Sequence, residues 1–275
     1  MQIASKIIYG TAWKAEQTKS LVVNAVLQGF RAIDTAGQPK HYREDLVGDA
    51  LEILAKEHGI KRADLFLQTK YTSVEGQDPK LAIPYNPNDP ISDQIQASLE
   101  KSLANLKTTY LDSYLLHSPL KTVEQTVEAW RALISLQKAG KVRMIGVSNT
   151  YDVHILHELS RERAVEIVQN RWYEGNDWDR QVHEFCRVNG IMYQSFWTLS
   201  GSPSLVNHPA LRGLAKVAGC TPEQAVFKFA QLEQVIPLSG TTSTLHMQQD
   251  VAAERIQLPP DANDYLNSLR KFVRG

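Results

Sequence analysis

Eight short apolar runs alternate with longer segments of helical periodicity along the chain, and this alternation constrains the fold more than any other feature. The runs predict strands at 6–11, 31–34, 65–69, 111–116, 142–147, 166–169, 191–196 and 235–238. The segments between and after them predict helices at 18–28, 44–57, 91–103, 123–138, 151–159, 180–188, 208–217, 223–233, 243–252 and 261–272. Such alternation is typical of an α/β fold with a parallel sheet.

The number of strands favours one closed (β/α)₈ barrel, the TIM barrel, as a single domain over residues 1–275. The alternative is an open doubly wound sheet, which normally carries Gly-x-Gly-x-x-Gly after its first strand. Here the first strand leads into Gly10-Thr-Ala-Trp-Lys14, which lacks that pattern. The sequence therefore predicts the closed barrel.

Charge and apolar patterning exclude several classes of partner. The 30 basic and 30 acidic side chains leave no excess charge to attract nucleic acid. No window of about twenty apolar residues suits a membrane span, and the N-terminal stretch lacks the pattern of a secretory signal. Cys186 and Cys220 are far apart and have no metal-ligand spacing. We therefore predict a cytoplasmic protein, monomeric by default, that acts on a small molecule and holds no metal.

Two smaller clusters have competing interpretations. His154 and His157 are spaced to share a helix face, but no third ligand stands beside them, so no metal site is predicted. Trp172, Tyr173 and Trp178 follow the sixth predicted strand. These aromatic residues either wall a substrate pocket or pack a long loop.

Reactive side chains stand where consecutive predicted strands end. Asp34 ends the second strand, Lys70 follows the third and His117 follows the fourth. Tyr42 lies in the loop after Asp34. Singly, these residues also suit a turn cap, a solvated lysine and a core histidine. Because the carboxyl ends of barrel strands meet at one rim, we expect the four side chains to converge on one site.

Together these four groups suit proton delivery to a carbonyl oxygen. A phenol has a pKa of about 10, and a nearby ammonium lowers it. A carboxylate keeps the ammonium charged, and a neutral imidazole orients the carbonyl group. None of the four groups supplies a hydride, so the reaction requires a redox cofactor.

Five segments in order resemble the aldo-keto reductase superfamily, in particular its fungal-type members similar to 2,5-diketogluconate and aldehyde reductases. The segments are Arg31-Ala-Ile-Asp-Thr-Ala36, Tyr42-Arg-Glu-Asp-Leu-Val-Gly48, Leu67-Gln-Thr-Lys70, Tyr114-Leu-Leu-His117 and Ala139-Gly-Lys-Val-Arg-Met-Ile-Gly-Val-Ser-Asn149. The resemblance implies NAD(P)H-dependent reduction of an aldehyde or ketone, with Tyr42 as proton donor assisted by Lys70, Asp34 and His117. It implies NADPH as the cofactor, bound across the barrel mouth.

The same resemblance implies a set of cofactor contacts. Ser148, Asn149 and Gln169 would hydrogen-bond the carboxamide, and Phe196 would stack on the nicotinamide ring. The other implied contacts lie at the ends of strands one and two and in the segments after strands seven and eight: Thr11, Asp34, Thr198, Leu199, Ser200, Ser202, Pro237, Ser239, Gly240, Thr241 and Gln248. Backbone N–H groups in the last segment, where a helix begins, suit a phosphate.

The chain also departs from the family pattern. The segment Gly37-Gln-Pro-Lys-His41 separates Asp34 from Tyr42 more widely than is usual. Tyr42 is still assigned, because the residues after it match and the loop holds no other tyrosine. Leu238 and Thr244 stand where the family has a lysine and an arginine that bind the 2′-phosphate of NADPH. NADH is therefore an alternative cofactor.

Two other functions are compatible with the same fold. A non-catalytic, cofactor-binding regulatory barrel would bind the cofactor without turnover, and the complete set of four reactive residues argues against it. An isomerase or aldolase acting on a phosphorylated sugar would use Lys70 to form a Schiff base, which borohydride traps.

Overall fold

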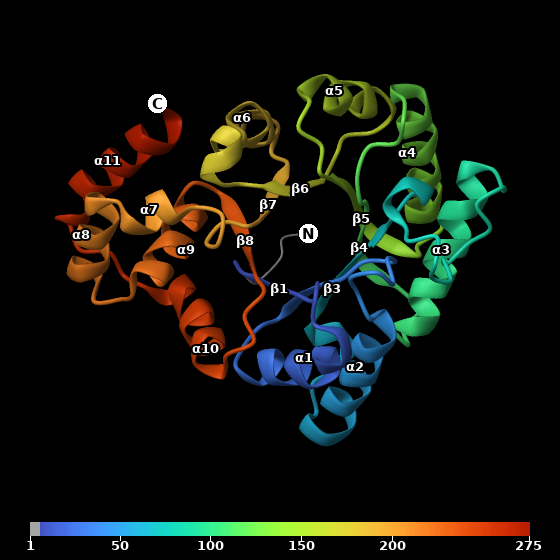
Figure 1. The fold of residues 1–275 in the computed structure, drawn as a ribbon, viewed down its shortest axis with the longest axis horizontal. Helices are drawn as coiled ribbons and strands as arrows, with labels where there is room; N and C mark the ends of the chain where they lie inside the picture. Colours follow the sequence, from blue (N-terminus) through green and yellow to red (C-terminus); the bar gives the residue numbers. More distant parts are fainter. Residues whose placement is uncertain (1–5) are drawn as a thin grey trace.

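The computed structural model describes residues 6–275 and contains eight parallel strands closed into a barrel in chain order (Figure 1). The strands are β1 (Ile8–Gly10), β2 (Ala32–Asp34), β3 (Phe66–Tyr71), β4 (Leu111–Leu116), β5 (Val142–Ser148), β6 (Ile167–Arg171), β7 (Met192–Phe196) and β8 (Val235–Ser239). The barrel closes where Ile8 of β1 pairs with Leu238 of β8. The predicted single-domain (β/α)₈ barrel is confirmed. Residues 1–5, which belong to the predicted domain and to the N-terminal stretch without a signal pattern, lie outside the described residues.

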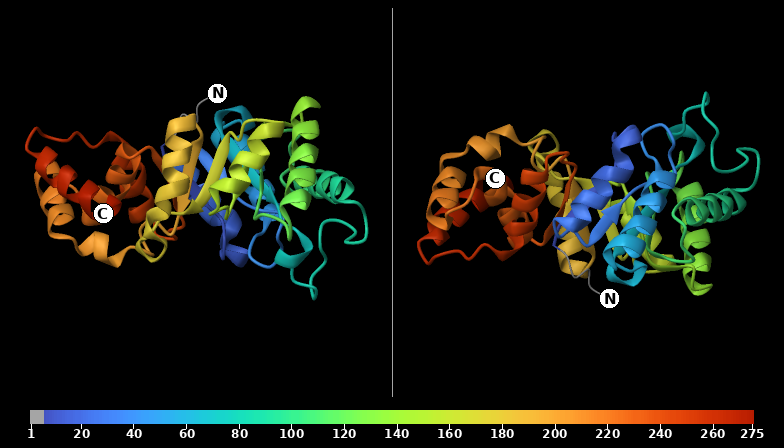
Figure 2. Two further views of the ribbon diagram at one scale, coloured as in Figure 1. Left: turned by 90° about the horizontal axis from the view of Figure 1, so that it is seen from above. Right: turned by 90° about the horizontal axis from the view of Figure 1, so that it is seen from below.

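Helices surround the barrel. They are α1 (Thr18–Leu27), α2 (Glu44–His58), α3 (Ile91–Asn105), α4 (Val123–Lys138), α5 (Val153–Glu162), α6 (Arg180–Asn189), α7 (Pro203–Asn207), α8 (Pro209–Ala218), α9 (Pro222–Leu232), α10 (Thr244–Ala252) and α11 (Ala262–Arg274). Helices α7 to α11, coloured orange to red, gather on one side of the barrel and extend the molecule in that direction (Figure 2). Across residues 6–275, no helix combines the length and the apolar character that a membrane span needs.

Helix α7 was not predicted, because five residues are too few to show a helical period.

Helix α9 begins at the residues that its capping sequence predicts. The Thr221 hydroxyl accepts the Gln224 N–H at 3.2 Å, and the Gln224 side chain accepts the Thr221 N–H at 3.1 Å. This reciprocal cap, with Pro222 at the first helical position, fixes the start of α9 beside the barrel mouth.

The inside of the barrel changes from apolar to polar toward the carboxyl ends of the strands. Near the amino ends of β3, β6 and β7, the inner layer consists of Phe66, Ile167 and Met192. Because alternate residues of a strand share a face, the residues two positions further on also point inward. These are the buried amides Gln68, Gln169 and Gln194. The next inward positions, at the carboxyl ends, are Lys70, Arg171 and Phe196. The polar end of the barrel therefore forms the floor of any site at its mouth.

Strand β3 runs further than the sequence indicated. It extends to Tyr71, whereas the apolar run predicted an end at residue 69. Tyr71 pairs with Leu116 of β4, so the ladder continues past the polar Lys70. Lys70 therefore lies within a strand, on its inward face, and not in the loop that follows.

The aromatic residues after β6 pack the protein and do not wall its main cavity. Trp172 is fully buried and packs against α9, and Trp178 packs against α11. Tyr173 lies edge-on to Trp197, with the ring centroids 5.5 Å apart. Of the two interpretations of this segment, packing of the loop is the one that the structure favours.

Candidate active site

A cavity of about 1030 Å³ opens at the carboxyl ends of the strands. Asp34, Tyr42 and His117 line this cavity. Lys70 lies directly beneath it, with only 1% of its surface exposed, and forms an ion pair with Asp34. The structure thus brings together all four reactive residues predicted from the strand ends.

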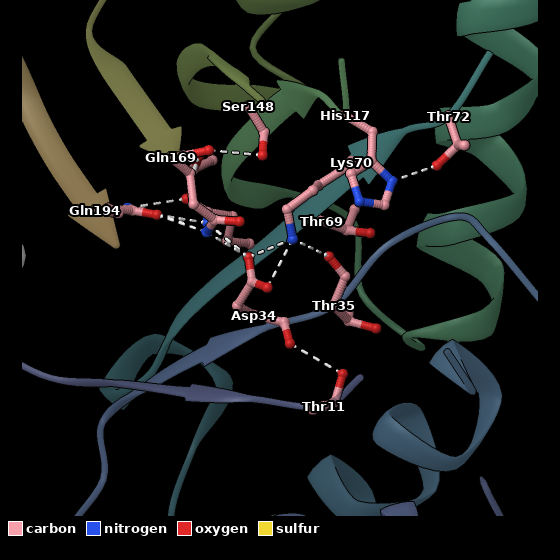
Figure 3. Close-up of polar contacts among 12 residues, drawn as sticks. Thr11, Asp34, Thr35, Thr69, Lys70, Thr72, His117, Ser148, Gln169 and Gln194 are labelled. Carbon is pink, nitrogen blue, oxygen red and sulfur yellow. Dashed lines mark hydrogen bonds and ion pairs between the residues drawn. The ribbon is translucent and has the colours of Figure 1, made fainter. Parts of the chain in front are cut away.

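The Lys70–Asp34 pair is the most highly connected part of the site (Figure 3). The Lys70 Nζ donates to Asp34 Oδ1 at 2.7 Å, to Asp34 Oδ2 at 2.6 Å and to the Thr35 carbonyl at 2.9 Å. Asp34 Oδ1 also accepts from Gln68 Nε2 at 2.7 Å and from Gln169 Nε2 at 3.0 Å. These donors satisfy the buried carboxylate and hold the ammonium in one position.

Burial dominates the electrostatics of the tyrosine. Burial lowers the pKa of the Lys70 ammonium, and the Asp34 carboxylate opposes that shift. The Lys70 Nζ lies 5.6 Å from the centroid of the Tyr42 ring. Even so, burial and then the Asp34 charge raise the pKa of the Tyr42 hydroxyl above its ordinary value. The sequence led us to expect a lowered pKa. That expectation is wrong for this structure, where the phenol stays protonated at neutral pH.

His117 is held as a neutral imidazole. Its backbone N–H donates to the Tyr71 carbonyl at 2.8 Å, and its Nδ1 lies 2.7 Å from the Thr72 hydroxyl (Figure 3). Burial, followed by the charges of Lys70 and His41, lowers its pKa to about 3. The imidazole ring meets the Tyr42 ring edge-on, with the centroids 5.9 Å apart. The cavity therefore carries two uncharged proton-bearing groups side by side.

The segment after Tyr42 is anchored to the barrel by contacts that explain its sequence. The buried Glu44 carboxylate accepts from the Thr69 hydroxyl of β3 at 2.6 Å. Gly48 lies so close to the end of α3 that a Cβ atom there would come within 2.0 Å of the Asn105 carbonyl oxygen. These contacts position the start of α2, and with it Tyr42, relative to β3.

The unusual segment 37–41 forms part of the cavity rim. The Trp13 N–H donates to the His41 carbonyl at 2.8 Å, and the two rings lie tilted against each other with their centroids 3.6 Å apart. Gln38 Nε2 donates to the Gly76 carbonyl at 2.5 Å. The insertion is thus fixed between the loops after β1 and β3, and Trp13, which is 75% exposed, projects from the rim.

Most of the implied cofactor contacts line this same cavity: Asp34, Ser148, Asn149, Gln169, Phe196, Thr198, Leu199, Ser200, Ser239, Gly240 and Thr241. Thr11, Ser202 and Pro237 are buried outside its wall. Gln248 is exposed on α10, where its Nε2 donates to Oε1 of Gln28, the residue that follows α1, at 2.8 Å. The structure therefore brings the main set together and leaves these four residues outside it.

The three residues predicted to bind the carboxamide, Ser148, Asn149 and Gln169, take part in hydrogen bonds with one another and with His117. The Ser148 hydroxyl donates to the Gln169 carbonyl at 2.7 Å, and Asn149 Nδ2 donates to the His117 carbonyl at 2.8 Å. Through these bonds the ends of β4, β5 and β6 are linked at the cavity floor.

Sequence reasoning missed several residues of the cavity wall: Trp13, Lys14, His41, Arg171, Glu223 and Asp250. Strand alternation is a signal for Arg171, because it stands two positions after the inward Gln169. Lys14 follows the first strand, and its Nζ donates to the Gly240 carbonyl in the loop after β8. No comparable periodic signal marks Glu223 and Asp250, which reach the cavity from helices α9 and α10.

Asp250→Asn is expected to stabilise the protein at about pH 8 and to have little effect at about pH 4. Burial raises the pKa of the Asp250 carboxyl from 3.8 to about 6, although the Ser239 hydroxyl donates to it at 2.6 Å. Above pH 6 the carboxylate is charged in the folded and unfolded states, and its burial costs stability. This cost is on the order of 3 kcal/mol at most, and it disappears as pH falls toward 3.8. Urea unfolding of the wild-type protein and of Asp250→Asn at both pH values measures this difference in stability. Equal destabilisation at both would contradict this interpretation.

The fold and the cavity together define a (β/α)₈ barrel whose reactive side chains lie at the carboxyl ends of its strands, where barrel enzymes have their active sites. Residues 6–271 match the aldo/keto reductase family, and the chain belongs to this family of oxidoreductases.

Similar proteins cover nearly the whole chain. Methylglyoxal reductase DkgA of Escherichia coli (strain K12) is 31% identical over 270 residues, which cover 96% of this chain and 88% of the relative. Glyoxal reductase of Bacillus subtilis (strain 168) is 28% identical over 261 residues, which cover 94% and 85%. A solved aldo/keto reductase from Brucella melitensis has a TM-score of 0.78 and 24% identity, with 96% of this chain and 93% of that chain covered. The Bombyx mori aldo-keto reductase in complex with NADP has a TM-score of 0.79 and 20% identity, with 97% and 88% covered. These two structures are similar in fold.

Proposed function

We propose that this protein is an NADPH-dependent reductase of aldehydes or ketones in which Tyr42 donates the proton. The observation that carries the proposal is the convergence of Tyr42, His117 and the Lys70–Asp34 pair on one cavity. The relatives support it, since they are named as reductases of methylglyoxal and of glyoxal. Small 2-oxoaldehydes are therefore the first substrates to test.

Tyr42 is the proton donor in this proposal. Its hydroxyl is protonated at neutral pH, as a general acid requires, and burial raises its pKa above the ordinary value. When the proton leaves, negative charge develops on the phenol oxygen. The Lys70 ammonium, kept in place by Asp34, stabilises that charge, and burial of the pair leaves the attraction weakly screened by water.

His117 orients the substrate. With the Thr72 hydroxyl donating to Nδ1, we assign the proton of the neutral ring to Nε2. An Nε2–H group directed into the cavity donates a hydrogen bond to the carbonyl oxygen and places that oxygen beside Tyr42. Because the pKa of His117 is about 3, the ring stays neutral over the physiological pH range.

The cavity suits a dinucleotide cofactor, and NADPH supplies the hydride that the side chains lack. Ser148, Asn149 and Gln169 would hold the carboxamide, and Phe196 the nicotinamide ring. Uncharged Leu238 and Thr244 replace the usual phosphate-binding pair. The Lys14 ammonium beside Gly240 supplies a positive charge at the same loop, which supports NADPH. The NADP-bound Bombyx mori structure is similar in fold.

Titration with NADPH and with NADH, followed by quenching of tryptophan fluorescence, tests this proposal. Trp197 lines the cavity and is 49% exposed, so a signal is expected. We expect NADPH to bind more tightly than NADH and to be oxidised when methylglyoxal is added. Equal affinities would mean that the 2′-phosphate is not recognised. Binding of neither cofactor would remove the hydride source and refute the reductase function.

A turnover assay and a borohydride trapping assay separate the two alternative functions. Cofactor binding without turnover on any carbonyl compound would indicate a regulatory barrel. Covalent trapping of a sugar phosphate on Lys70 by borohydride would indicate a Schiff-base enzyme. The three hydrogen bonds of Lys70 and its burial argue against that role, because a nucleophilic lysine must reach its substrate.

A further inference from the structure

Arg171 lines the cavity, and no step of the proposed mechanism uses its side chain. It is the last residue of β6, it pairs in register with Phe196 of β7, and it lines the cavity wall. It follows the inward Gln169 by two positions, so it shares the inward face of the strand. Its side chain therefore belongs to the mouth of the barrel.

Two aromatic rings hold the guanidinium group in place. The Arg171 Cζ lies 4.3 Å from the centroid of the Trp197 ring and 5.5 Å from that of the Phe196 ring. Trp197 is itself supported edge-on by Tyr173. Stacking on ring faces leaves the N–H edges of a guanidinium group available for hydrogen bonds, and it reduces the entropy lost when a ligand binds.

The charge of Arg171 has no counter-charge. Its Nε is buried without a hydrogen-bond partner, and no carboxylate of residues 6–275 forms an ion pair with it. Arg62 and Arg143, at the opposite end of the barrel, both pair with the buried Asp112. A part-buried cation without a partner lowers stability unless a bound anion offsets its charge.

We propose that Arg171 is an anion-binding residue of the cavity. Its guanidinium group binds an anionic group of a ligand, either the diphosphate of the dinucleotide or a carboxylate on the carbonyl substrate. The planar N–H edges match the oxygen pairs of both groups. The identity of the ligand rests on the proposed reductase function, whereas the unpaired, ring-stacked guanidinium group does not.

The first part of the test is a cofactor titration of the full-length protein carrying Arg171→Met. If the diphosphate is the occupant, the Kd for NADPH and the Kd for NADH rise by the same factor, about 10- to 100-fold, because both cofactors carry the diphosphate. Arg187→Met is the matched control. Arg187 is exposed on α6 and pairs with Glu184, so its loss leaves both Kd values unchanged.

The second part measures kcat/KM at saturating NADPH for succinic semialdehyde and for its uncharged methyl ester. If a substrate carboxylate is the occupant, Arg171→Met lowers kcat/KM for the acid by about 10- to 100-fold. It leaves kcat/KM for the ester and both cofactor Kd values unchanged. Arg171→Gln provides a second neutral variant if the methionine variant does not fold.

Unchanged cofactor Kd values together with an unchanged acid-to-ester ratio would overturn the proposal and leave Arg171 as a packing partner of Trp197. A rise in Kd for NADPH alone would also overturn it, because neither named anion is specific to NADPH. The titrations require no turnover. A wild-type protein that binds NADPH but reduces no carbonyl compound would refute the reductase function. The effect of Arg171→Met on the two cofactor Kd values would still test whether Arg171 binds the diphosphate.

Discussion

Tyr42→Phe is expected to lower kcat by roughly 10²- to 10⁴-fold, the range that a positioned general acid contributes. The Kd for NADPH should change by less than about threefold. The phenyl ring keeps its edge-on contact with His117 and its position over Lys70, so the cavity keeps its shape. Only the proton that the hydroxyl carries is lost. Steady-state kinetics with methylglyoxal and a fluorescence titration with NADPH measure the two effects separately.

A second tyrosine provides the control for this prediction. Tyr265 lies on α11, far along the chain from the strand ends, and it packs against Gly213 of α8. Tyr265→Phe should leave kcat unchanged. Full activity in Tyr42→Phe would show that Tyr42 is not the proton donor. Another group of the cavity would then have to donate the proton.

The order of the barrel strands could be predicted from the sequence, and so could the meeting of Asp34, Lys70 and His117. Both results depend only on local signals and on one rule of topology. Apolar runs mark strands, and consecutive parallel strands of a barrel are neighbours with their carboxyl ends on one rim. No side-chain geometry is needed to conclude that residues at three successive strand ends converge.

The polar inner layer of the barrel could not be predicted in the same way. Gln68 and Gln194 interrupt runs that otherwise look apolar, and a polar residue in a strand suits either face. Only Gln169, which ends its predicted strand, is marked as a site residue by the family resemblance. The three-dimensional pairing decides which face is inward. In the structure Gln68 and Gln194 exchange hydrogen bonds at 2.8 and 3.1 Å across the barrel, and Gln68 reaches Asp34. Partners 126 positions apart in the chain leave no signature in any local window.

The electrostatics of Tyr42 were also beyond sequence reasoning. The sequence indicates which charges stand near the phenol, and the presence of Lys70 alone predicts a lowered pKa. The sign of the net shift depends on how completely the hydroxyl is removed from water. In the structure burial is the largest cause, and the net pKa is raised. That depth is a property of the folded barrel mouth and cannot be read from residues adjacent in the chain.

Lys70→Met is expected to lower the free energy of unfolding by roughly 3–5 kcal/mol at neutral pH, the usual effect of breaking a buried ion pair. Asp34 would keep its hydrogen bonds from Gln68 and Gln169 but lose the only cation that is ion-paired with it among residues 6–275. A buried carboxylate without a counter-charge is strongly unfavourable. Urea unfolding measures the loss, and kcat should fall as well, because no cation remains to stabilise the phenolate of Tyr42.

Two further variants show whether the uncompensated charge is the cause of that loss. Adding Asp34→Asn to Lys70→Met removes the charge and should restore at least half of the lost stability, while kcat stays low. Lys107→Met breaks solvent-accessible ion pairs with Asp49 and Glu52 and should cost less than about 1 kcal/mol. If Lys70→Met and Lys107→Met were equally mild, the buried pair would contribute little to folding. Its retention beneath Tyr42 would then be explained by catalysis alone.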